Sequence, residues 1–124
     1  MEKIKIKVSH KDKRGLITDL LEKQNINAIT LITQKKGSIR GNHFHKKTIQ
    51  WNYVLKGKLE LYTQKKNEKL KKTVLSKGEL AVTVKNEAHA IIALQNTEFL
   101  VFTEGPRGGK EYENDTFRLK NSLV

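Results

Sequence analysis

Residues 37–57 read GSIRGNHFHKKTIQWNYVLKG, and this stretch decides the fold. His43 and His45 stand two positions apart in it, so a β-strand would turn both imidazoles to the same face. After a polar turn, apolar and polar residues alternate as far as Lys56-Gly57, a pair typical of a tight hairpin. The stretch therefore predicts two consecutive strands, with both histidines on one face of the first.

The second of these strands carries two amide side chains on one of its faces. Gln50 and Asn52 are two positions apart, so they can face the interior together with the histidine pair. A third histidine, His89, lies in a later apolar run that also fits a strand. Three imidazoles and one amide oxygen make a complete set of ligands for a divalent metal. We therefore expect one interior site formed by His43, His45, Gln50 and His89.

The rest of the chain keeps the two-residue alternation of β-strands. Further strands are predicted at residues 4–8, 28–34, 58–64, 80–84, 88–94, 99–103 and 116–119. Residues 16–24 fit either a short helix or a strand followed by a turn. Roughly nine or ten short strands with tight turns indicate an all-β sandwich or barrel. At 124 residues, a single domain, 1–124, accounts for the whole chain.

The composition excludes several classes of protein. There is no cysteine, which excludes disulfides, thiolate nucleophiles and zinc ribbons. The apolar runs are too short for a membrane span, and the start of the chain, MEKIKIKV, lacks the continuous apolar region of a signal peptide. We therefore expect a cytoplasmic protein with no membrane partner.

The formal net charge of +12 points to an anionic partner. It comes from twenty-one lysines and only four arginines, and the lysines are scattered over turns and strand edges. Proteins that bind nucleic acids use arginine forks and stacked aromatic side chains, which this sequence lacks, so we expect a small anionic ligand and no nucleic acid. Arginine can bind an anion through two parallel hydrogen bonds, although a salt bridge at a turn is its commoner use.

The C-terminal segment, residues 105–119, differs from the rest of the chain. It begins with GPRGG, which holds the only proline, and continues with an alternating stretch, KEYENDTFRL. The pattern fits a loop that leads to the last predicted strand, a lid, or an arm that pairs with a second subunit. Tyr112 and Asp115 lie where they could reach the mouth of the barrel as an acid or a base.

These motifs resemble those of the cupin superfamily, whose members are small antiparallel jelly-roll barrels and are often dimeric. Residues 37–57 resemble the first cupin motif in their two glycines, their histidine pair and the spacing to the next ligand. Residues 78–89, GELAVTVKNEAH, resemble the second motif, although Val84 and Asn86 stand where the family usually has proline and glycine. The resemblance implies a single-domain cupin barrel that forms a homodimer and holds a metal or a substrate in its mouth.

Gln50 departs from the cupin pattern, because the family usually has glutamate at this position. Three neutral histidines and a neutral amide leave the charge of a divalent ion uncompensated. The resemblance therefore implies a divalent metal (Fe, Mn, Ni or Zn) that binds less tightly than at a carboxylate site. Such a metal would be a stronger Lewis acid and would favour an anionic ligand.

A second resemblance concerns the nucleotide-sugar branch of these barrels. RGNHFHK at 40–46 resembles the RGxHxHK segment of the dTDP-4-dehydrorhamnose 3,5-epimerases and the dTDP-keto-sugar isomerases, and DKRGLI at 12–17 resembles their DxRG element. In these enzymes, which commonly need no metal, a histidine removes the proton next to a keto group and basic side chains hold the pyrophosphate. The resemblance implies His43 or His45 as the catalytic base and Arg40 and Lys46 as anion ligands.

The phase of the first strand tests the role expected for Arg40. Arg40 and His43 are an odd number of residues apart, so a regular strand would turn them to opposite faces. A β-bulge at Gly41 would reset the phase and turn both side chains inward. Without a bulge, Arg40 would face outward and could not hold a phosphate inside the barrel.

Our leading hypothesis is an isomerase or epimerase of a nucleotide-linked keto sugar in surface polysaccharide biosynthesis. A histidine would serve as the base, a metal or the pair Arg40 and Lys46 would stabilise the enolate, and Asn52 would bind a sugar hydroxyl. Two alternatives stay open. One is a metal-dependent (Fe, Ni or Mn) cupin dioxygenase, and the other is a non-catalytic cupin that binds a sugar or a small anion.

Overall fold

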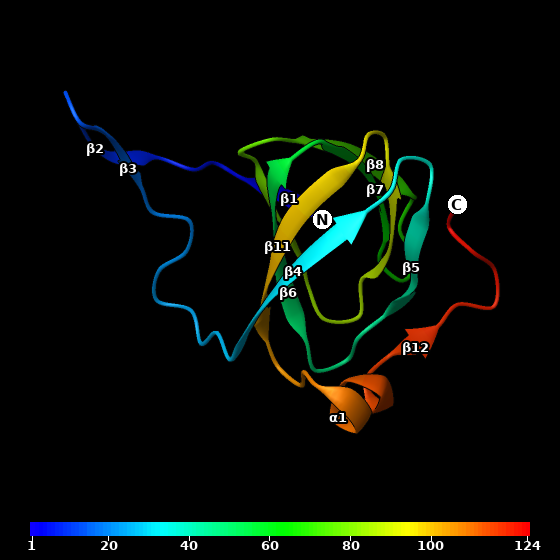
Figure 1. Cartoon of the computed structure of the whole chain (residues 1–124). Helices are drawn as coiled ribbons and strands as arrows, with labels where there is room; N and C mark the ends of the chain where they lie inside the picture. Colours follow the sequence, from blue (N-terminus) through cyan, green and yellow to red (C-terminus); the bar gives the residue numbers. More distant parts are fainter.

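The computed structural model describes all residues, 1–124, and consists mainly of β-strands (Figure 1). The strands are β1 (Glu2–Ile4), β2 (Val8–Asp12), β3 (Gly15–Thr18), β4 (Ala28–Gln34), β5 (Ile39–Phe44), β6 (Ile49–Lys56), β7 (Lys58–Gln64), β8 (Lys71–Ser76), β9 (Leu80–Thr83), β10 (Ala88–Ala93), β11 (Thr97–Glu104) and β12 (Phe117–Arg118). The single helix, α1 (Gly109–Asn114), has six residues, and no helix has the length and apolar character needed to span a membrane.

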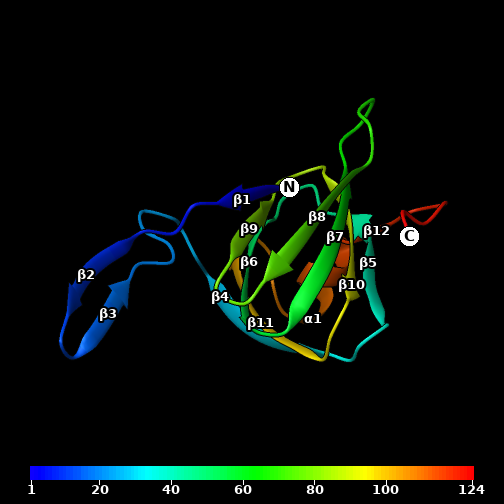
Figure 2. The ribbon, with the colours of Figure 1, turned by 90° about the horizontal axis from the view of Figure 1, so that it is seen from above.

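Ten of the twelve strands form two five-stranded sheets. One sheet has the order β1-β9-β6-β11-β4 and the other has the order β12-β5-β10-β7-β8, with antiparallel pairing throughout. Many neighbours in these sheets are distant in sequence, as in a jelly roll. Viewed from above, the two sheets enclose a common interior (Figure 2). The predicted all-β, antiparallel jelly-roll barrel is confirmed.

The interior of the barrel changes from apolar to polar along its strands. On β10 the inward-facing residues run from Ala93 through Ile91 to His89, and on β6 the same direction leads from Val54 to Gln50. The polar ends of these two strands line one cavity. The barrel therefore has an apolar end, which packs as a core, and a polar end, which holds the predicted site residues.

The hydrophobic core fills the apolar end. It contains ten buried residues: Met1, Val54, Leu59, Leu61, Leu75, Ala81, Ile91, Ala93, Phe99 and Val101. Fully burying a leucine-sized side chain contributes about 1.5–3 kcal/mol to folding. This cluster therefore supplies much of the stability that holds the polar end in place.

Strands β2 and β3 form a hairpin that projects from the barrel, which we call the arm (residues 8–18; Figures 1 and 2). Its apolar residues Val8, Leu16 and Ile17 are 51%, 59% and 57% exposed. Of the two interpretations of residues 16–24, the strand followed by a turn is correct, because β3 ends at Thr18 and no helix follows.

Residues 105–119 close the polar end of the barrel. The alternation expected for residues 110–119 is wrong in its first half, because residues 109–114 form α1. The helix is favoured because its last carbonyl groups find partners nearby: the Asp115 N–H and the Thr116 hydroxyl both donate to the Tyr112 carbonyl. The predicted last strand is present as β12, which pairs with β5 of the same chain.

Candidate functional site

A β-bulge in β5 turns Arg40 and His43 to the same side of the strand. Gly41 and His43 take consecutive partners on β10, which leaves Asn42 between them unpaired. The φ angles of Gly41 and Asn42 are 95° and 58°, in the left-handed region that glycine and asparagine tolerate. The break in phase expected at Gly41 is therefore present, and both Arg40 and His43 line one cavity.

Gly41 also marks a close approach between the two strands that carry histidines. A Cβ atom at this position would lie 2.7 Å from the His89 carbonyl oxygen, far inside van der Waals contact. Any larger residue would push β5 away from β10. Because His43 and His89 are direct partners across these strands, the glycine holds their imidazoles together.

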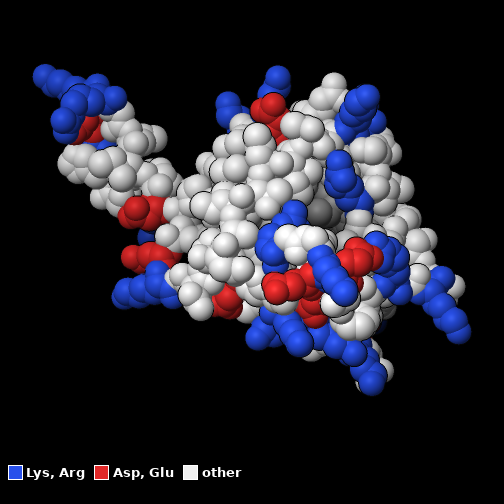
Figure 3. Space-filling model, turned by 60° about the horizontal axis from the view of Figure 1, so that its bottom comes forward, with Lys and Arg blue, Asp and Glu red and all other residues white.

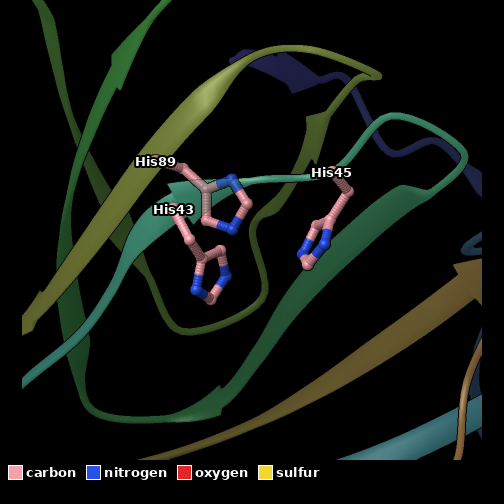
Figure 4. A group of neighbouring side chains, drawn as sticks. All are labelled: His43, His45 and His89. Carbon is pink, nitrogen blue, oxygen red and sulfur yellow. The ribbon is translucent and has the colours of Figure 1, made fainter. Parts of the chain in front are cut away.

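The three predicted histidines meet at the polar end of the barrel (Figure 4). Ring centroids are 4.7 Å apart for His43 and His89, 4.8 Å for His43 and His45, and 5.4 Å for His45 and His89. One nitrogen of each ring lies within 4.8 Å of the other two. His45 and His89 are buried, at 2% and 5% exposure, whereas His43 is half-buried.

Main-chain carbonyl groups fix the orientation of two of the rings. His45 Nδ1 lies 2.8 Å from the Asp115 carbonyl oxygen, and His89 Nδ1 lies 3.2 Å from the Glu87 carbonyl oxygen. A carbonyl oxygen only accepts, so both Nδ1 atoms carry the proton and both Nε2 atoms keep a lone pair. The buried Nε2 of His45 has no hydrogen-bond partner in the protein, so it is free to accept a proton or to bind a ligand.

Asp115 is held firmly enough to orient His45. Its carboxylate accepts hydrogen bonds from the main-chain N–H groups of Lys46 and Lys47 and from the Thr48 hydroxyl, at 2.7–3.1 Å. Burial raises the pKa of Asp115, but these hydrogen bonds outweigh it and hold the pKa below its ordinary value. The carboxylate is thus a turn-stabilising group, which differs from the acid or base role considered for it above.

The histidines are neutral at physiological pH. Burial, reinforced by the neighbouring imidazoles, lowers the pKa of His43 to about 4 and that of His89 to about 3. Burial also lowers the pKa of His45, against the opposing effect of the Asp115 hydrogen bond. The cluster therefore offers uncharged imidazole nitrogens with free lone pairs at pH 7.

A cavity of about 440 Å³ opens above the histidines. The polar lining of this cavity consists of Arg40, His43, Gln50, Asn52, His89, Arg107 and Tyr112. The apolar remainder comes from the edge of the core. The size falls within the usual range for small-molecule sites. On the face that carries α1, basic side chains lie beside a hollow (Figure 3).

The arginines divide into two kinds. Arg14 pairs with Asp12 and Arg118 pairs with Glu113, so both form surface salt bridges. Arg40 and Arg107 form no ion pair, and both line the cavity. Arg40 donates only one long hydrogen bond, of 3.4 Å, and Arg107 lies over the Tyr112 ring, 4.4 Å from its centroid. The two unpaired guanidinium groups are therefore free to bind an anion in the cavity.

The structure brings most of the predicted site residues together, but it places Lys46 elsewhere. Arg40, Gln50 and Asn52 line the same cavity as the histidines. The expected position of Lys46 in that cavity is wrong: its ammonium group lies over the Phe117 ring, 4.4 Å from the centroid, on the outer face of the barrel. The reason is that β5 ends at Phe44, and Lys46 lies in the bend after it, where its main-chain N–H donates to the Asp115 carboxylate.

The sequence analysis placed Tyr112 at the mouth of the barrel but did not assign Arg107 to the site. The Tyr112 ring lies 5.3 Å from the His45 ring. Arg107 had one available signal, since it is one of four arginines in a lysine-rich chain. Its place depends on how the 105–119 segment folds back over the barrel, and local pattern does not determine that.

An antiparallel jelly roll with a histidine cluster at one end of its interior defines a cupin-type barrel. The chain belongs to the family described as the polysaccharide biosynthesis C-terminal domain, whose model matches residues 10–117. No relative was found among curated protein sequences.

Solved structures share the fold at low sequence identity. QdtA, a sugar 3,4-ketoisomerase from Thermoanaerobacterium thermosaccharolyticum in complex with TDP, is 23% identical, with a TM-score of 0.77 over 96% of this chain and 88% of that chain. A dTDP-4-dehydrorhamnose 3,5-epimerase from Sulfolobus tokodaii is 18% identical, with a TM-score of 0.76 over 98% and 77%. The rmlC epimerase of Mycobacterium tuberculosis is 14% identical, with a TM-score of 0.77 over 94% and 67%.

Proposed function

We propose that the protein is an isomerase or epimerase of a nucleotide-linked keto sugar. One observation carries the proposal: a single cavity holds neutral imidazoles and two arginines without carboxylate partners. Neutral imidazoles suit removal of a proton next to a carbonyl group, and unpaired guanidinium groups suit a diphosphate. The family is one of polysaccharide biosynthesis, and the structural neighbours include a sugar 3,4-ketoisomerase and a 3,5-epimerase.

His43 is the proposed base, because it lines the cavity while His45 lies buried beside it. Its imidazole takes the proton from the carbon next to the keto group, and the electron pair of that C–H bond forms an enolate. Delivery of a proton to the other face of the same carbon gives the epimer. Delivery to the former carbonyl carbon, with transfer of the proton of the adjacent hydroxyl to the former carbonyl oxygen, gives the isomer. The alternative base is His45, whose Nε2 keeps a free lone pair.

Binding and charge stabilisation fall to different side chains in this proposal. Arg40 and Arg107 hold the diphosphate, and Asn52 binds a sugar hydroxyl. Gln50 makes no side-chain hydrogen bond within the protein, so its amide N–H groups can donate to the developing enolate oxygen.

The three histidines also fit a divalent metal such as Fe, Mn, Ni or Zn, with Gln50 as a fourth ligand. Tetrahedral ligands on zinc are about 3.4 Å apart, so the histidine nitrogens would need only a small inward shift from their present spread of up to 4.8 Å. A metal bound there would act as a Lewis acid toward the sugar carbonyl.

We expect Gln50→Glu to raise the affinity for Zn²⁺ at least about tenfold, measured by calorimetry, because it supplies the missing charge. Unchanged affinity would remove Gln50 from the ligand set.

A homodimer is proposed as the working form. An isolated two-stranded hairpin is marginally stable in water, yet the arm exposes three large apolar residues. Edge strand β4 has a free side and presents Ile29 and Leu31, which are 64% and 60% exposed. We propose that the arm of one copy packs against β4 of a second copy. A cytoplasmic location stays a prediction.

The reaction can be tested with TDP-4-keto-6-deoxyglucose, the compound bound in another QdtA structure. In D₂O, proton NMR should show loss of the hydrogen signal next to the keto group and growth of product signals. His43→Asn should slow this exchange by about 10²–10⁴, the usual contribution of a general base. Arg40→Ala should raise KM about tenfold, whereas Lys36→Ala, a charge-matched change at the surface, should not.

The outcomes separate the remaining possibilities. Exchange that stops in His45→Asn but continues in His43→Asn assigns the base to His45. No exchange in the wild-type protein, with or without added metal, would rule out the isomerase. Oxygen uptake that depends on added iron would favour the dioxygenase instead.

A further inference from the structure

A second hollow, which we call the outer pocket, lies behind the strand that carries the histidine pair. It has a volume of about 590 Å³ and is lined by Phe44, Lys46, Gln64, Lys65, Lys66, Asn67, Asn86 and Ala88. It shares no residue with the histidine cavity. Phe44 alternates with the inward-facing histidines along the chain, so the outer pocket lies on the outside of the barrel.

The lining of the outer pocket has one sign of charge. It contains three lysines and three amide side chains, and no aspartate or glutamate. None of these three lysines forms an ion pair, whereas Lys3 and Lys72 elsewhere on the surface do. Unpaired ammonium groups attract phosphate, and amide groups both donate hydrogen bonds to hydroxyls and accept them. This combination suits a ligand that carries phosphate and several hydroxyl groups.

One wall of the outer pocket is rigid. The Phe44 ring stacks on Phe117 with centroids 5.3 Å apart, and the Lys46 ammonium group lies over the same Phe117 ring. The Asn86 main-chain N–H donates to the His45 carbonyl oxygen at 2.6 Å, which ties the turn at 84–87 to the end of β5. The Lys46 ammonium group and the Asn86 main chain are therefore held in place before any ligand arrives, which reduces the entropic cost of binding.

The opposite wall comes from the turn between β7 and β8. Lys65, Lys66 and Asn67 lie in this turn, and the Gln64 side-chain amide donates to the Glu68 carbonyl at 3.0 Å across it. The turn therefore presents two ammonium groups toward the fixed wall. We propose that the outer pocket is a second binding site, for a sugar phosphate, with the phosphate on the lysines and the hydroxyls on the amides. The site is independent of the reaction proposed above.

Glucose 1-phosphate is the probe for this site. In spectra of ¹⁵N-labelled protein, titration should shift the side-chain amide signals of Asn67 and Asn86 together, with one dissociation constant. Lys65→Ala/Lys66→Ala should weaken this binding about tenfold or more, as expected for loss of a charge-assisted contact. Lys69→Ala/Lys71→Ala is the matched control, because it removes the same charge from the same hairpin but leaves the pocket lining intact. It should weaken binding less than twofold, by roughly 0.4 kcal/mol at most.

Three results would overturn the proposal. Equal weakening by the two double variants would mean general attraction to a basic hairpin. Equal affinity for glucose and for glucose 1-phosphate would mean that the pocket does not recognise the phosphate. Shifts that disappear in Arg40→Ala would assign the binding to the histidine cavity. Persistence of the shifts in Arg40→Ala, together with loss in Lys65→Ala/Lys66→Ala, supports the second site whether or not the isomerase activity is found.

Discussion

His45 and His89 illustrate how single main-chain atoms prepare a side chain for chemistry. The carbonyl groups of Asp115 and Glu87 fix the protons on Nδ1, so any further proton must be added at Nε2. Both Nε2 atoms belong to buried rings beside another imidazole, where positive charge is poorly solvated. The rings therefore remain neutral over a wide range of pH.

This neutrality predicts a particular loss of stability in acid. The pKa of His89 is about 3 in the folded protein, against an ordinary value of 6.5. As the pH falls below 6.5, the unfolded chain binds the proton and the folded chain does not, so the free energy of unfolding decreases. We expect the melting temperature of metal-free protein to fall in this range. His89→Gln cannot titrate, so it should show a shallower fall; parallel curves would contradict the prediction.

At the scale of single elements, the bulge in β5 makes the site. It points the side chains of Arg40 and His43 toward one cavity, and Gly41 allows β10 to lie close to β5. We expect Gly41→Ala to destabilise the fold by more than about 2 kcal/mol, because strain at positive φ adds to a clash with the His89 carbonyl. Gly37→Ala is the control, since its φ is 84° but its Cβ would meet nothing within 4 Å. If both variants lost the same free energy of unfolding in urea, backbone strain alone, and not the clash with β10, would explain the effect.

The segment that contains α1 and β12 supports the site through Asp115. Asp115→Ala would leave two part-buried main-chain N–H groups and the buried Thr48 hydroxyl without acceptors, and we expect the free energy of unfolding in urea to fall by about 1–3 kcal/mol. The same change should reduce turnover, because the turn and the carbonyl that orient His45 would shift. Glu111→Ala, an exposed change in the same helix, should alter neither. A fully stable Asp115→Ala protein would contradict this account.

At the scale of the molecule, the arm and strand β4 predict self-association. Leu16→Lys on the arm and Leu31→Lys on β4 should each shift the protein from dimer to monomer in analytical ultracentrifugation, because a charge would be buried between the copies. Leu70→Lys changes an exposed leucine, at 45% exposure, on the β7–β8 hairpin and should leave the dimer intact. A wild-type monomer at tens of micromolar would rule out the dimer.

The sequence predicted the barrel and the histidine cluster because both follow from periodicity and the spacing of HxH. The bulge at Gly41 was also foreseeable, since only a change of phase brings Arg40 and His43 to one side. The resemblance misplaced Lys46, because the strand ends at Phe44 and the bend that follows turns this side chain to the outer face. The position of Arg107 in the cavity depends on the adjacent helix α1. Tertiary hydrogen bonds to Asp115 set the position of that helix, and the local sequence pattern does not predict them.

The separation of apolar and polar ends within one barrel has a consequence for how such a protein can change. The core residues Val54 and Ala93 lie on the same strands as Gln50 and His89, toward the other end of the barrel. Exchanges of polar cavity residues such as Gln50 therefore leave the packing of Val54 and Ala93 in the core unchanged. Related proteins with this fold can therefore acquire new ligands or new chemistry at the polar end while the apolar end keeps its packing.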